Sequence, residues 1–134
     1  MGEGVLRLIG TVAAGLLFFV VAEFLLGALA RALWPEYAGA AASGAFTTSM
    51  LGSRLAAGAI ATTCAGATTS MISNAARPAA LWLGVTLLVT SILWHYQIWD
   101  KYPVWYHLTW FASIVPAALL GGRLVNRSIT AQQL

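Results

Sequence analysis

The sequence predicts an all-α protein, an integral membrane bundle of four antiparallel transmembrane helices. Composition is the first observation behind this prediction: 60% of the 134 residues are apolar, 8% are charged, and the mean hydropathy is +0.80. A soluble domain carries about 25% charged residues. Because one small core cannot hide this much apolar surface from water, we expect lipid to cover the rest.

The spacing of the charges is the second observation, because it leaves uncharged runs long enough for membrane spans. A helix needs about 20 mostly apolar residues to cross a hydrocarbon core of about 30 Å. The first predicted span covers about 5–33, with Glu23 inside it and Pro35 just beyond its end. The Ala-Leu-Ala sequence at 28–30 resembles the Ala-x-Ala cleavage site of a signal peptide. The apolar run exceeds the about 7–15 residues of a signal core, however, so we expect it to be retained.

Three further spans follow a short linker of small residues at 36–46. Asn74 and Pro78 separate the second span from the third, since the residue before a proline resists helical geometry and proline suits a first helical turn. The polar tail after 125 is expected to fray. The chain is therefore a single four-helix domain, and its remaining spans are predicted at about 47–73, 78–99 and 103–125.

The basic side chains predict the orientation of the bundle. An even number of spans places both termini on one side of the membrane, and short loops with more Lys and Arg face the cytoplasm. The residues that decide this are Arg7, Arg77, Arg123 and Arg127 on the terminal side, against Arg31, Lys101 and the shallow Arg54 on the other. We therefore expect both termini in the cytoplasm and the protein in a bacterial inner membrane.

The second predicted span is rich in Ala, Gly, Ser and Thr, unlike the other spans. Small residues recur in it at steps of four, which places them on one face of a helix. This row consists of Gly58, Thr62, Gly66 and Ser70. Such a face lets two helix backbones approach closely, and hydroxyl groups can bond across the contact. Two interpretations stay open: a central packing helix within one chain, or the interface or pore-lining helix of an oligomer.

Two ionisable side chains fall within the predicted spans, in the part that lies away from the termini. Glu23 and Arg54 lie at similar depths, in the half of the membrane opposite the termini. A charged side chain inside a bilayer costs free energy. Such a residue therefore indicates either a functional site or an ion pair with another charged side chain. Glu23 can act as a proton- or cation-responsive carboxylate. Alternatively, Glu23 and Arg54 form an ion pair that sets how their helices pack.

The stretch from Trp94 to Trp110 contains four Trp, three Tyr and both histidines of the chain. Trp and Tyr concentrate at membrane–water boundaries, so the stretch is typical of a hairpin that turns at the membrane surface. His95 and His107 should lie at similar depths on its two helices. Together with Asp100 they are weak candidates for a metal or haem site. A proton-sensitive or polar ligand site is the third interpretation.

Several classes of function have no support in the sequence. It contains no Gly-x-Ser-x-Gly elbow, phosphate-binding loop or metal-ligand spacing, so we expect neither an enzyme nor a cofactor. The basic residues are dispersed, which argues against nucleic acid as a partner. Cys64 is the single cysteine and cannot form a disulfide within the chain.

The leading functional hypothesis is a small non-enzymatic subunit or accessory protein that packs against other membrane helices, because no domain outside the membrane is predicted. The alternative is a small homo-oligomeric transporter or channel with a polar outer vestibule lined by Glu23, Arg54 and the two histidines. A second alternative is a metal- or haem-binding membrane protein with its site on the outer face. Lipid is an expected partner in all three cases, alongside other membrane subunits or further copies of the chain.

Overall fold

The computed structural model of the chain describes residues 2–73 and 76–132. Within these ranges the chain consists of helices and short connections, with no strand. The long helices are α1 (Gly2–Leu33), α3 (Thr48–Ile72), α4 (Ala76–Gln97) and α5 (Val104–Gln132), and the short ones are α2 (Pro35–Ser43) and the 3-10 turn η1 (Trp99–Lys101). The predicted all-α fold class is confirmed.

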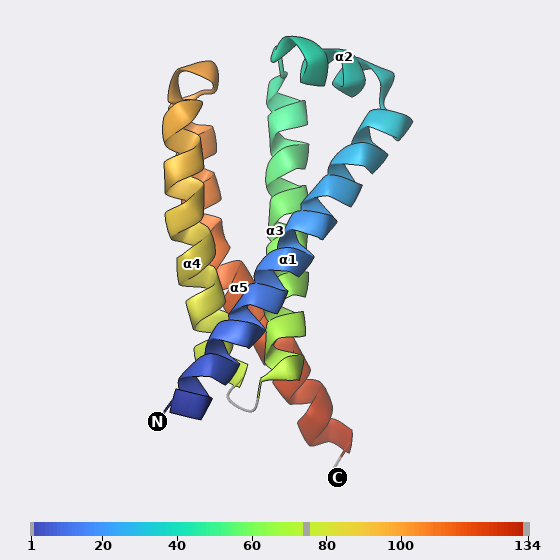
Figure 1. Ribbon diagram of the computed structural model, residues 1–134. Helices are drawn as coiled ribbons and strands as arrows, with labels where there is room; N and C mark the ends of the chain where they lie inside the picture. Colours follow the sequence, from blue (N-terminus) through green and yellow to red (C-terminus); the bar gives the residue numbers. More distant parts are fainter. Residues whose placement is uncertain (1, 74–75, 133–134) are drawn as a thin grey trace.

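The four long helices run in alternating directions (Figure 1). The start of α1 and the end of α5 lie at one end of the bundle. α2 and the connection between α4 and α5 lie at the opposite end, here called the α2 end. Segments long and apolar enough to cross a membrane are Gly2–Leu33, Thr48–Ile72, Arg77–Gln97 and Val104–Arg127. By length and composition, the chain is therefore suited to a membrane.

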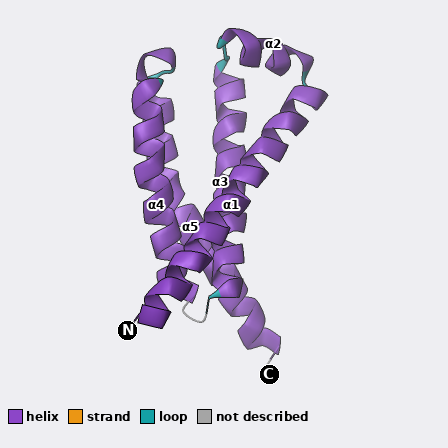
Figure 2. Cartoon of the chain, viewed as in Figure 1, coloured by secondary structure: helices purple, strands orange, loops and turns teal. Residues whose placement is uncertain are grey.

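The segment expected to be a linker is a helix, α2, which connects α1 to α3 at the end of the bundle opposite the termini (Figure 1, Figure 2). Pro35 occupies its first turn, where proline is favoured, and Gly44 follows its last residue in the left-handed conformation, with a φ of 77°. The alanines between them are strong helix formers, which explains why a run of small residues folds this way. Tyr37 and Ala40 are buried together with Met50, which holds α2 against α3.

The last helix continues beyond its predicted end at 125. α5 runs to Gln132, and the segment 124–132 contains no proline or glycine that would stop it. Pro116 lies inside α5, and the helix continues on both sides of it. The polar tail, expected to fray after 125, is therefore helical as far as Gln132.

α3 is the central helix, and its most extensive packing is against α5. Gly58, Thr62, Gly66 and Ser70 are all buried on α3. A methyl group added at Gly66 would overlap the backbone carbonyl of Ala118 in α5, so the two backbones are in direct contact there. The row of small residues therefore packs inside this chain, where it brings α3 and α5 together.

α1 lies at the edge of the bundle, and its buried residues are Thr11 and Gly15. Gly15 lies directly against the hydroxyl of Thr69 in α3. Large apolar side chains on the rest of α1, such as Leu17 and Phe24, are exposed, as a lipid-facing surface requires. Toward the α2 end α1 tilts away from α4 (Figure 1). This tilt positions the cavities described next.

Candidate functional site

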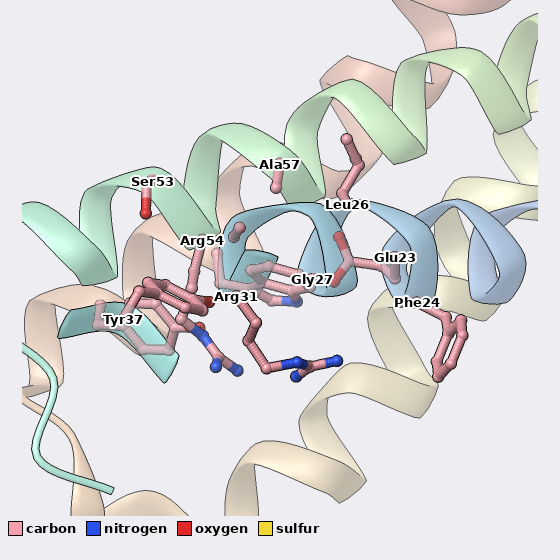
Figure 3. Close-up of a pocket in the computed structure, with 12 residues that line it drawn as sticks. Glu23, Phe24, Leu26, Gly27, Arg31, Tyr37, Ser53, Arg54 and Ala57 are labelled. Carbon is pink, nitrogen blue, oxygen red and sulfur yellow. The ribbon is translucent and has the colours of Figure 1, made fainter. Parts of the chain in front are cut away.

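Two adjoining cavities lie between α1 and the rest of the bundle, in the half nearer the α2 end. The first has a volume of about 290 Å³ and is drawn in Figure 3. The second has a volume of about 440 Å³ and lies between α1, α4 and α5. The two cavities share four lining residues and are treated as one vestibule. The shared residues are Glu23 of α1, Arg54 of α3, and Tyr106 and Trp110 of α5.

Glu23 is partly buried in the wall of the vestibule. Figure 3 shows its carboxylate pointing into the cavity, toward the side on which Arg54 lies. The Oε1 atom of Glu23 is buried and has no hydrogen-bond partner among the described residues. A buried acceptor without a donor costs about 1–3 kcal/mol, and more when it is charged. Its donor therefore comes from outside those residues, from water or a solute in the cavity.

Arg54 reaches the same space from the first turns of α3. Its Nε atom donates a hydrogen bond of 3.3 Å to the hydroxyl of Tyr106. The guanidinium carbon lies 4.8 Å from the ring centre of Phe46 and 6.0 Å from that of Tyr102, within the range of cation–π contacts. Aromatic side chains thus hold Arg54 in place. Arg54 and Glu23 face one vestibule, but within the described ranges no hydrogen bond joins them.

His95 and His107 are buried and bonded to each other, with 2.7 Å between their Nδ1 atoms. The Nε2 atom of His107 lies 3.2 Å from the carbonyl oxygen of Trp99. Because a carbonyl only accepts, Nε2 of a neutral His107 carries the proton and its Nδ1 is the acceptor. His95 therefore donates from Nδ1. Its Nε2 is left as an acceptor in a ring that lines the vestibule.

The two histidines and Asp100 form no metal-ligand shell in this structure. Within the described ranges, no three His, Cys, Asp or Glu side chains gather. The two Nδ1 atoms bond to each other, whereas Zn²⁺ needs each ligand nitrogen about 2.0–2.1 Å away. Asp100 is exposed on η1, and the bond that His107 makes near that turn goes to the carbonyl of Trp99. The described residues therefore do not gather a three-ligand zinc shell around His95 and His107.

The aromatic stretch divides into an exposed part and a part that builds the vestibule. Trp94 and Tyr96 are 62% and 83% exposed, as anchors at a membrane boundary would be. Tyr106 is only 2% exposed and stacks on His95, with 5.8 Å between the ring centres. Membrane anchoring therefore accounts for only some of these rings.

Tyr106 and Trp110 are site residues that the sequence pattern assigns to the membrane boundary. Tyr106 accepts from Arg54, and the indole N–H of Trp110 donates to Ser91, with 3.1 Å between the two atoms. Tyr106 and Trp110 are four residues apart, which places them on one face of α5, whereas Trp105 is exposed. This four-residue spacing is the sequence signal that distinguishes the aromatic residues of the vestibule wall from those at the membrane boundary.

Comparisons with known proteins assign no family: no family model, no curated protein and no solved structure matches the chain. Function must therefore be inferred from the chemistry of the vestibule. That chemistry combines a carboxylate oxygen with no partner in the described ranges, an arginine held by aromatic rings and a histidine acceptor.

Proposed function

We propose that the protein is a small membrane transporter that admits a polar solute through the vestibule at the α2 end. The observation that carries this proposal is the Oε1 atom of Glu23, a buried acceptor in a cavity wall that lacks a donor among the described residues. A solute with an N–H or O–H group would supply that donor. Carboxylates inside a membrane are costly, and they commonly mark substrate and ion pathways.

The vestibule favours a small solute that has both a donor and an acceptor. Glu23 can accept from such a solute. The terminal nitrogens of Arg54 can donate to it, because within the described ranges only Nε of that side chain is hydrogen-bonded. The opposite charges of Glu23 and Arg54 favour a neutral or zwitterionic solute over a simple ion. The volume of the first cavity, about 290 Å³, suits a molecule of few heavy atoms.

The proposed orientation has the α2 end on the outer side of a bacterial inner membrane and both termini in the cytoplasm. Its support is the excess of basic residues near the terminal end. Glu23 precedes Leu33, the last residue of α1, by ten residues. This separation corresponds to about 15 Å along a helix. A solute from the outer side would therefore pass Arg31 and Arg54 before it reaches Glu23.

An accessory subunit remains the second candidate, and its support is the exposed apolar surface of α1. Lipid covers such a surface as well as a partner helix does, so this surface does not require a partner. The vestibule, in contrast, has polar groups that neither lipid nor an apolar helix would satisfy. Because one chain builds the whole vestibule, the proposal also does not require the homo-oligomer considered from the sequence.

Reconstituted liposomes test this proposal with glycerol, urea and glycine as probes. We expect at least one probe to enter faster than it enters protein-free liposomes. Light scattering follows glycerol and urea, and a radiolabel follows glycine. Glu23→Gln should slow that entry about tenfold, because it removes a charged acceptor from the solute's path. Circular dichroism of the variant should show unchanged helicity.

Glu36→Gln is the matched control, because Glu36 is exposed on α2 and lines neither cavity of the vestibule. Entry through this variant should equal that of the wild type. If all three probes enter at the protein-free rate, the proposed transport of such solutes is wrong. If Glu23→Gln transports at the wild-type rate, Glu23 does not contact the solute.

A further inference from the structure

A third cavity, of about 620 Å³, lies at the α2 end and is lined by three cationic side chains. Arg31 comes from the last turn of α1, Arg54 from α3 and Lys101 from η1. Distant parts of the sequence thus bring three positive charges to one space. Among its described lining residues there is no acidic side chain. We call this space the cationic cavity.

Arg54 is held in a fixed position in the cationic cavity. Its Nε atom is bonded to Tyr106 and its guanidinium packs over the ring of Phe46, which also lines the cavity. Its two terminal nitrogens make no hydrogen bond within the described ranges. Figure 3 shows the side chains of Arg31 and Arg54 extending in the same direction. Guanidinium groups with free N–H donors match the oxygens of a phosphate or carboxylate.

The acidic residues of the α2 end do not line the cationic cavity. Glu36 and Asp100 are exposed at this end but are absent from its described lining, and Glu23 lies in the wall of the vestibule instead. Like charges that share a space repel each other. An anion in the cavity would relieve this repulsion.

We propose that the cationic cavity binds an anionic group of the phosphate or carboxylate type. The cavity lies where the spanning helices end, which is the depth of lipid headgroups. The anion is therefore either the headgroup of a lipid or a small anion from the aqueous side, and the experiment below separates these sources. The proposal does not depend on transport, because it concerns an anion in a cavity that Glu23 does not line.

The full-length chain in neutral detergent tests both sources of the anion. The lipid probes are phosphatidylglycerol and phosphatidylcholine, with bound lipid counted by native mass spectrometry. The free-anion probe is inorganic phosphate, with the unfolding temperature compared to that in sodium chloride of equal ionic strength. The test variant is Arg31→Gln with Lys101→Gln. The matched control is Arg7→Gln with Arg123→Gln, which removes the same charge from exposed positions at the other end.

If a lipid fills the cavity, the wild type and the control bind phosphatidylglycerol in preference to phosphatidylcholine. The test variant then binds phosphatidylglycerol about tenfold more weakly. If a free anion fills the cavity, phosphate raises the unfolding temperature of the wild type and the control but not of the test variant. The proposal is overturned if the wild type shows neither effect, or if the test variant behaves like the control.

Two more variants protect this experiment from a folding artefact. Arg31→Lys with Lys101→Arg keeps both charges, so it should bind as the wild type does. If circular dichroism shows that the test variant loses helicity, Lys101→Gln alone replaces it, because Lys101 is exposed on η1. Unchanged binding by that single variant would likewise count against the proposal.

Discussion

The hydrogen bond between His95 of α4 and His107 of α5 joins the two helices close to their connecting turn. Both rings are buried, and Trp99 stacks on His107 with 4.5 Å between the ring centres. Burial of these polar rings is tolerated because His95 donates to His107 and His107 donates to the carbonyl of Trp99. The hairpin pattern places the two histidines at one depth, but the bond depends on how each helix is rotated.

Replacement of one histidine should destabilise the protein, because the other histidine loses its hydrogen-bond partner. His107→Leu leaves the Nδ1–H group of His95 without an acceptor, so we expect the free energy of unfolding to fall by about 1–3 kcal/mol. The double variant His95→Phe with His107→Leu should recover part of this loss, because it removes both partners. Unfolding in a detergent titration, followed by circular dichroism, measures both values. Strictly additive losses would contradict the bond.

Metal removal should leave the hairpin intact. The two Nδ1 atoms are bonded to each other, and no third metal-binding side chain joins them within the described ranges. We therefore expect the same unfolding temperature by scanning calorimetry before and after treatment with EDTA. A decrease that added Zn²⁺ reverses would instead show a metal site at this hairpin.

At the scale of helices, the row of small residues on α3 sets how closely α3 packs against α5. Gly66 lies against Ala118, and Gly121 of α5 lies against the backbone of Thr63 in α3. At both points the backbones are too close for a side chain, so glycine is required. The spacing of small residues predicts such a face, but it does not name the helix that packs there.

Two glycine substitutions on α3 separate close packing from helix propensity. Gly66→Ala should lower the free energy of unfolding by roughly 1–3 kcal/mol, because the methyl group would overlap the carbonyl of Ala118. Gly52→Ala is the matched control, since a Cβ atom there meets nothing within 4 Å. It should raise stability by up to about 1 kcal/mol, because alanine is the better helix former. Thermal unfolding in detergent compares them, and equal effects would argue against the close contact.

At the scale of the molecule, the vestibule residues Glu23, Arg54 and His95 gather in the half of the bundle nearer the α2 end. α1 contacts α3 through Gly15 and tilts away from α4 toward the α2 end (Figure 1). The vestibule and the cationic cavity both lie at this end, and Arg54 lines both. A solute and an anion would therefore approach from the same side of the membrane.

The orientation of the bundle is testable with single cysteines in a Cys64→Ser background. We expect a membrane-impermeant maleimide to label Ser43→Cys on α2 in intact spheroplasts. Gly2→Cys, at the start of α1, should be labelled only after lysis, because the basic terminal end is expected in the cytoplasm. The opposite labelling pattern would reverse the proposed orientation.

Native mass spectrometry of protein extracted gently from its own membrane tests the accessory-subunit hypothesis. Because the vestibule lies within one chain, we expect the mass of this chain, or of several copies, without a second polypeptide. A constant second polypeptide would favour the accessory subunit. The identity of that partner would then direct the search for the function.

The sequence by itself determined that this chain is helical, where its long helices lie and that lipid suits its surface. These properties are local, because hydropathy, helical periodicity and proline positions act over one or a few turns. The same local view marked Glu23 and Arg54 as unusual, since both interrupt apolar runs. It missed the helix α2, because the composition of 36–46 also fits a linker.

Only the tertiary structure decided which polar side chains meet. It joined Arg54 to Tyr106 and His95 to His107, and it left an oxygen of Glu23 without a partner among the residues that the structure describes. It also gathered the charges of the cationic cavity from three separate elements. The physical reason is that such contacts depend on the tilt and rotation of each helix. Side-chain packing between helices sets that tilt and rotation, and hydropathy does not specify them.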